Sequence, residues 1–147
     1  MRISRYLILF VVVLVCISTT GFAQSTVSFM GNWGGSIKVP DRDEIPIILV
    51  IEDGTFTHYL KFDDDWRVVN PATNYYEQLG DILLIGWINT GGVWTENQIF
   101  SISYVNPRKV EIVWTRHVIN REEGQDGSSW NMRGEGELIK VDWPPDF

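Results

Sequence analysis

The sequence predicts an all-β protein, an antiparallel up-and-down β-barrel, with a β-sandwich as the alternative. The chain contains eight or nine short runs of β-branched, aromatic or alternating apolar residues. Turn signals separate these runs at spacings of about ten residues, which is typical of barrels and sandwiches. Helical periodicity is almost absent, so we expect at most a short helix within the loops.

Composition limits the possible classes of protein. The length of 147 residues is that of a single domain, and 44% apolar residues argue against disorder. An excess of 19 acidic over 12 basic residues argues against nucleic acid as the main partner, because phosphate binding needs a basic face. The one cysteine excludes an internal disulfide and a cysteine-based zinc site.

Residues 1–23 have the pattern of a cleaved secretory signal peptide. Arg2 and Arg5 precede an apolar run of 12 residues, and Gly21 and Ala23 supply small side chains before the expected cleavage point. A run of 12 residues is short for a membrane-spanning helix, although an uncleaved anchor is the alternative. We therefore expect an exported protein, periplasmic or extracellular, whose mature chain has no transmembrane segment.

The expected mature chain, residues 24–147, is one β-domain of 124 residues. It has no cysteine, because Cys16 lies in the leader, and it retains all seven tryptophans. Loss of Arg2 and Arg5 leaves ten basic against 19 acidic residues, a net charge of −9. This charge disfavours both nucleic acid and anionic membrane surfaces as partners.

The strands follow from local patterns taken in order along the chain. The first begins at 31–36, and a β-branched run at 45–51 is followed by Asp53-Gly54, a strong hairpin signal. Residues 55–62 then alternate, with His58 on the face that carries Phe56 and Leu60. The remaining strands are expected at 75–79, 82–89, 98–104, 109–119 and 130–141.

Turn residues mark the ends of these later strands. Asn70-Pro71, Gly80-Asp81 and Asn106-Pro107 are turn signals because proline and glycine fix backbone conformations that strands do not use. Residues 90–92 and a polar loop at 120–128, each with two glycines, separate the other strands. No internal repeat or low-complexity segment interrupts this order.

The first expected strand opens with Gly31-Asn32-Trp33. A Gly-x-Trp at this position, ahead of a meander of strands, resembles the opening of lipocalins and the wider calycin group. The resemblance implies an up-and-down barrel in which Trp33 closes the narrow end. It also implies an arginine that packs over this tryptophan, a place that Arg116 or Arg133 could fill. The Thr-Asp-Tyr segment of lipocalins is absent, so the resemblance is one of fold and says little about the ligand.

Two long strands each have a face suited to the interior. In 109–119 this face carries Val110, Ile112, Trp114, Arg116 and Val118. In 130–141 it carries Trp130, Met132, Gly134, Gly136 and Leu138. Inward glycines remove side-chain volume, so they either accommodate the neighbouring Trp114 ring or leave a cavity. The charge of an inward Arg116 needs a partner, because an unpaired buried charge is costly. We expect Arg116 to stack on Trp33, to pair with a buried acid, or to bind the carboxylate of an apolar ligand.

These patterns predict a binding protein without enzymatic activity. Seven tryptophans in a small domain are typical of an aromatic-lined cavity for a small apolar or amphipathic molecule. The expected lining comprises Trp87, Trp114, Arg116, Trp130 and Met132, with no cofactor. The alternative is a protein- or glycan-interaction module that uses surface aromatics, namely Trp66, Tyr75, Tyr76 and Trp94.

Catalytic and metal sites have little support in the sequence. His58 and His117 each lie in a strand without an adjoining ligand pair, which is less than a zinc site requires. The acidic clusters at 41–44 and 63–65 do not have calcium-loop spacing, so we expect solvated loop charge and no metal. An enzyme that uses His117 or a carboxylate pair is the least supported function.

Overall fold

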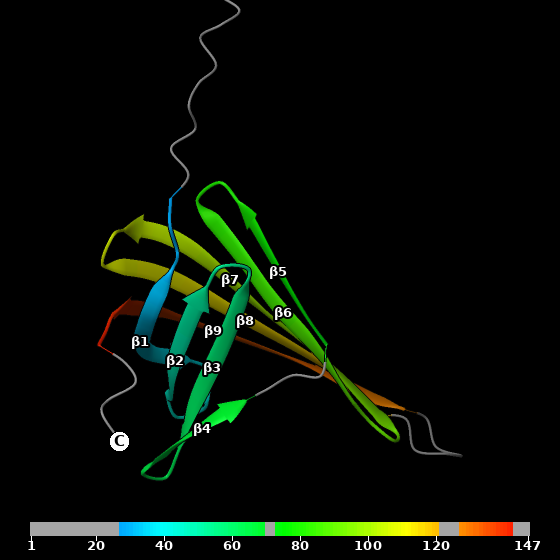
Figure 1. Cartoon of the computed structure of the whole chain (residues 1–147). Helices are drawn as coiled ribbons and strands as arrows, with labels where there is room; N and C mark the ends of the chain where they lie inside the picture. Colours follow the sequence, from blue (N-terminus) through cyan, green and yellow to red (C-terminus); the bar gives the residue numbers. More distant parts are fainter. Residues whose placement is uncertain (1–26, 70–72, 121–126, 143–147) are drawn as a thin grey trace, which may run out of the picture.

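The computed structural model describes residues 27–69, 73–120 and 127–142 (Figure 1). The expected signal peptide and Trp143 lie outside these residues. The described chain forms one antiparallel sheet, which confirms the all-β class. Its strands are β1 (Gly31–Lys38), β2 (Ile45–Glu52), β3 (Thr55–Phe62), β4 (Asp65–Val69), β5 (Thr73–Leu79), β6 (Ile82–Gly91), β7 (Trp94–Asn106), β8 (Lys109–Asn120) and β9 (Ser128–Lys140).

The sheet is a meander whose first and last strands pair with each other. The spatial order is β4-β3-β2-β1-β9-β8-β7-β6-β5, so only the pairing of β1 with β9 departs from chain order. An up-and-down barrel would also pair β4 with β5, but in the described residues these two strands are the sheet edges. The structure therefore does not confirm closure of the barrel. We call the gap between β4 and β5 the open seam.

The sheet curls so that β1–β3 face β6–β8, and the core lies between these two halves (Figure 1). Strands β6–β9 extend beyond the other half at the lower right of the figure. The Asp53-Gly54 hairpin forms as predicted, with Gly54 at a φ of 71°. The acidic cluster forms a turn as predicted, with Asp63 at a φ of 54°, but strand β4 follows it at Asp65–Val69, where the sequence predicted no strand.

Glycines in β9 allow its paired neighbour β1 to lie very close to it. A Cβ atom on Gly136 would lie 2.1 Å from the carbonyl oxygen of Ser36, and one on Gly134 would lie 2.4 Å from Ile37. The expectation that these inward glycines accommodate the Trp114 ring or leave a cavity is thus wrong. Strand β1 itself occupies the space, because a Cβ atom at either glycine would clash with it.

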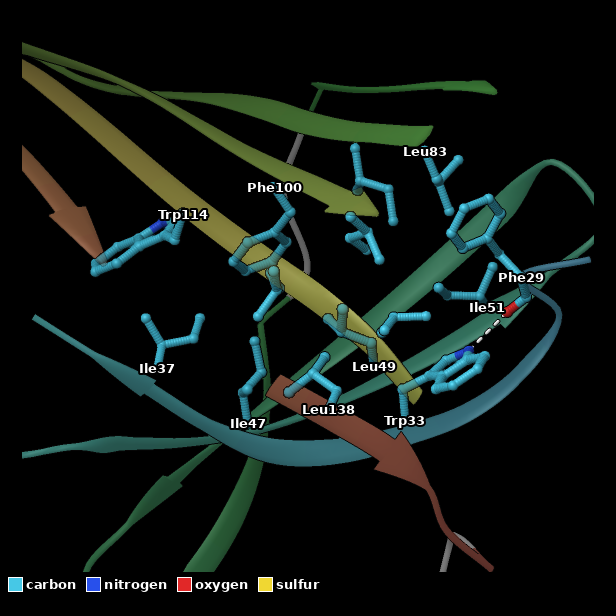
Figure 2. Close-up of a cluster of buried hydrophobic side chains, with 14 of the residues drawn as sticks. Phe29, Trp33, Ile37, Ile47, Leu49, Ile51, Leu83, Phe100, Trp114 and Leu138 are labelled. Atoms are coloured by element: carbon cyan, nitrogen blue, oxygen red, sulfur yellow. Dashed lines mark hydrogen bonds between the residues drawn. The ribbon is translucent and has the colours of Figure 1, made fainter. Parts of the chain in front are cut away.

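One end of the core is sealed by the segment that precedes β1. Trp33 is fully buried, and its Nε1 donates to the carbonyl oxygen of Phe29 at 2.6 Å, the hydrogen bond drawn as a dashed line in Figure 2. Phe29 packs edge-on against Tyr104, with ring centroids 6.0 Å apart. The side chain of Gln78 donates to the carbonyl oxygen of Val27 at 2.8 Å and so attaches this segment to β5. We call this region the closed end.

A lysine, not an arginine, lies over Trp33. Lys140 Nζ is 5.0 Å from the ring centroid and donates to the carbonyl oxygen of Met30 at 2.8 Å. The expectation that Arg116 or Arg133 fills this place is wrong. The register explains the difference, because Lys140 is the direct β9 partner of Trp33, whereas both arginines pair with glutamates elsewhere.

Candidate functional site

The concave face of β6–β9 carries most residues of the predicted site. Strand β8 alternates as expected: Ile112 and Val118 are buried, Trp114 is 9% exposed, and Arg116 points to the same face. The register places Trp87, Gln98, Arg116 and Met132 side by side in one row across the four strands. The next row away from the closed end holds Asn89, Glu96, Val118 and Trp130.

The predicted residues differ in how deeply they lie. Trp87 belongs to the core at 1% exposure, and Met132 is half-buried against the core. Trp130 is 44% exposed, beyond the packed part of the concave face. The sequence pattern thus places these side chains on one face, but the structure separates a buried group, Trp87 and Trp114, from an outer group formed by Met132 and Trp130.

A polar network connects strands β7 and β8 on this face. Arg116 donates to Glu96 Oε2 at 2.6 Å, and the Glu96 side chain is only 7% exposed. Gln98 donates to the other carboxylate oxygen of Glu96 and accepts from Trp114 Nε1 at 2.9 Å. Arg116 therefore pairs with a buried acid, one of the three expected arrangements. Its Nε has no hydrogen-bond partner among the described residues.

Between the two halves of the sheet, next to this network, is a small, partly open cavity. It measures about 40 Å³. Its lining is mostly apolar and comprises Ile37, Ile45, Ile47, His58, Leu60, Gln98, Phe100 and Trp114. Figure 2 shows Trp114 and Ile37 on the side away from Trp33, so the cavity lies opposite the closed end. We call this region the open end. The volume accommodates one or two water molecules and is far below the roughly 300 Å³ of typical small-molecule pockets.

His58 occupies the wall of this cavity and is the residue that the sequence analysis undervalued. It is 1% exposed and lies against Trp87, with ring centroids 4.5 Å apart and the planes tilted by 31°. Phe56 and Phe100 pack on its other sides. Burial lowers the pKa of His58 from 6.5 to about 4, so the imidazole is neutral at pH 7. The alternation of β3 placed His58 among apolar neighbours, which was the available signal.

His117 lies on the opposite, outer face of the sheet. It is exposed, and its Nδ1 contacts Asn131 Oδ1. The outer face forms an open groove of about 360 Å³ around these residues. Its lining comprises the outward-facing Asn97, Ile99, Thr115, His117, Asn131 and Arg133, together with Arg116 and Met132, which lie between them in sequence and belong to the concave-facing row. No three metal-ligating side chains converge within the described ranges, so the two histidines do not meet in one site there.

The remaining candidates are distributed over the surface. A second outer groove, of about 550 Å³, lies along Lys38, Pro40, Arg133, Gly134 and Glu135. The acidic residues at 41–44 and 63–65 are exposed, and Glu44 accepts a hydrogen bond from Ser36 at 2.7 Å. Among the surface aromatics, Tyr75 and Trp94 are 41% and 37% exposed, whereas Trp66 and Tyr76 are half-buried.

Comparison with known proteins adds no relative to this description. Within residues 27–69, 73–120 and 127–142, the chain forms no helix with the length and apolar character needed to cross a membrane. No protein-family model, no curated protein and no solved structure matches the chain.

Proposed function

We propose that this chain is an exported, non-enzymatic binding protein that holds a small apolar or amphipathic molecule at its open end. The observation that carries the proposal is the cavity between the two halves of the sheet, where apolar side chains adjoin a buried polar network. Small-molecule sites combine a mainly apolar wall with a few fixed polar groups in this way. The polar network fixes orientation, and the apolar wall supplies most of the binding energy.

The size of the cavity determines how such a molecule binds. A volume of about 40 Å³ accommodates only a head group, so the rest of the molecule lies outside it. The concave face of β6–β9 supplies a surface for this part, because Met132 is half-buried and Trp130 is 44% exposed there. The proposed ligand thus lies across the open end and is not enclosed within the core.

The same proposal includes export and a calycin-like shape. The basic and apolar pattern of residues 1–23 supports removal of a signal peptide and a periplasmic or extracellular location. The meander order, the pairing of β1 with β9 and the buried Trp33 support a distorted up-and-down barrel with its seam between β4 and β5. Peptide mapping of the protein secreted by its own host tests the cleavage, with Gln24 as the expected first residue.

An interaction module for proteins or glycans is the second candidate. The observation in its favour is that the outer groove, at about 360 Å³, is larger than the inner cavity. The groove offers amide, imidazole and hydroxyl groups from Asn97, Asn131, His117 and Thr115, which suit a polyhydroxylated ligand. Its lining includes no Phe, Tyr or Trp, so it lacks the aromatic anchors that such surfaces usually use.

Native mass spectrometry of protein purified from its own host tests the main proposal. We expect a mass increment from a bound small molecule that disappears when the protein is unfolded. Titration with a panel of hydrophobic ligands should also quench tryptophan fluorescence, because Trp114 lines the cavity and Trp87 packs against its lining residue His58. Protein that carries no small molecule and is quenched by none of the panel, but binds an oligosaccharide, would support the second candidate instead.

A further inference from the structure

Two buried nitrogen atoms, one on a residue of the cavity wall and one on the ring packed against that residue, have no hydrogen-bond partner within the described part of the chain. They are Nδ1 of His58 and Nε1 of Trp87, and both side chains are 1% exposed. A buried polar group without a partner costs about 1–3 kcal/mol, so native proteins rarely retain one without a reason. His58 lies in the cavity wall. Trp87 is not itself a lining residue, but it packs against His58 with ring centroids 4.5 Å apart and adjoins the lining residue Gln98 in register.

The polar groups around this pair carry no net charge. The positive charge of Arg116 is balanced by Glu96 at 2.6 Å, and Gln98 and Trp114 are neutral donors and acceptors. His58 is neutral because burial lowers its pKa to about 4. An ionised carboxylate placed here would lose its hydration without gaining a counter-charge, which is costly in an apolar cavity.

We infer that the ligand is an uncharged, largely apolar molecule with a carbonyl or hydroxyl oxygen that accepts a hydrogen bond from Trp87 Nε1. The inference rests on the proposed function and names the chemical class that the same site binds. The indole N–H can only donate, so it requires an acceptor. His58 Nδ1 donates or accepts according to its tautomer, so it bonds a carbonyl or a hydroxyl equally well.

This assignment replaces the expectation that Arg116 binds the carboxylate of a fatty or aromatic acid. Glu96 already balances the charge of Arg116. A ligand carboxylate would therefore either displace Glu96 and leave it buried and unpaired, or bind the unpartnered Nε as a second, uncompensated negative charge. A carbonyl oxygen carries no net charge, so it can bind without disturbing the pair of Arg116 and Glu96. A pure hydrocarbon is also disfavoured, because it would leave the nitrogen atoms of His58 and Trp87 unsatisfied.

Three probes of matched shape test the inference on the unmodified protein. Benzylacetone carries a ketone, hydrocinnamate carries a carboxylate in nearly the same place, and butylbenzene carries no oxygen. We expect calorimetric titration at neutral pH to show benzylacetone binding about tenfold more tightly than either of the others. Equal or tighter binding of hydrocinnamate or butylbenzene overturns the inference and leaves the proposed function standing. No binding of any probe overturns both.

A matched pair of variants then tests the named donor. Trp87→Phe retains an aromatic ring but removes the N–H, so benzylacetone should lose about three- to tenfold in affinity while butylbenzene is unaffected. Trp94→Phe is the control, because Trp94 lies at the exposed start of β7. Unchanged benzylacetone affinity in folded Trp87→Phe contradicts the assignment. If Trp87→Phe does not fold, the comparison of the three probes on the unmodified protein remains the test of the inferred ligand class.

Discussion

His58 of β3 packs against Trp87 of β6, with ring centroids 4.5 Å apart, and so joins the two halves of the curved sheet beside its open seam. No backbone ladder joins β4 to β5 in the described residues, so side-chain packing holds the halves together on this side. Trp87 also contacts Phe56 and Phe100, which come from opposite halves. The integrity of the open end therefore depends on a neutral imidazole within an aromatic cluster.

Stability should fall in mild acid because of His58. Its pKa is 6.5 in the unfolded chain and about 4 in the folded chain, so between these values only the unfolded chain binds the proton. The stabilisation is complete above pH 6.5 and is lost as pH falls towards 4. As the pH falls from about 7.5 to 4.5, His58 should lower the free energy of unfolding by about 2–3 kcal/mol.

Urea denaturation at these two pH values measures the effect, and His58→Phe is the reference. Other acidic groups titrate in both proteins, so the difference between the two pH profiles isolates His58. We expect the free energy of unfolding of His58→Phe to fall by about 2–3 kcal/mol less than that of the unmodified protein between about pH 7.5 and 4.5. Parallel profiles would show that His58 does not carry the pH dependence.

The ion pair on the concave face should respond unequally to loss of its two partners. Glu96 is 7% exposed in its side chain, whereas Arg116 is 31% exposed and can reach water. Arg116→Gln should therefore cost about 3 kcal/mol in the free energy of unfolding, because it leaves a buried carboxylate unpaired. Glu96→Gln should cost about 1 kcal/mol, because the guanidinium can rehydrate. Chemical denaturation at pH 7 gives both values, and an equal or reversed order would contradict this account.

The close approach of the paired strands β1 and β9 should make Gly136 intolerant of any side chain. A Cβ atom there would lie 2.1 Å from a backbone oxygen of Ser36, which cannot move without shifting the strand. Gly136→Ala should destabilise the fold by about 1–3 kcal/mol or more, as overpacking does. Ser129→Ala on the exposed start of the same strand is the control. Coinciding thermal melts of Gly136→Ala and Ser129→Ala would contradict this prediction. They would show that β1 and β9 accommodate a side chain at position 136 without loss of stability.

Strand alternation made much of the fold predictable. The runs at 45–51 and 55–62 became β2 and β3, and the inward parity of β8 correctly brought Arg116 to the concave face. These features depend on neighbours along the chain, where period-two patterning is a direct physical signal. The acidic partner of Arg116 lies on another strand, 20 residues away, and only the register of β7 with β8 brings Glu96 beside it.

Long-range geometry accounts for what the sequence did not reveal. Composition suggested a roomy interior, yet atoms of β1 occupy the space left by Gly134 and Gly136. Lys140 lies over Trp33 because of the β1–β9 register, which no local pattern specifies. Likewise, no local pattern specifies that β4 and β5 form no ladder with each other in the described residues.

Indole N–H signals in a two-dimensional NMR titration test the central claim, binding at the open end, most directly. Benzylacetone should shift the signals of Trp87 and Trp114 and leave that of Trp33, which donates to Phe29 at the closed end, unchanged. Assignment by single Trp→Phe variants identifies each signal. Shifts confined to Trp66 or Trp94, or no shift at a saturating concentration, would contradict the account.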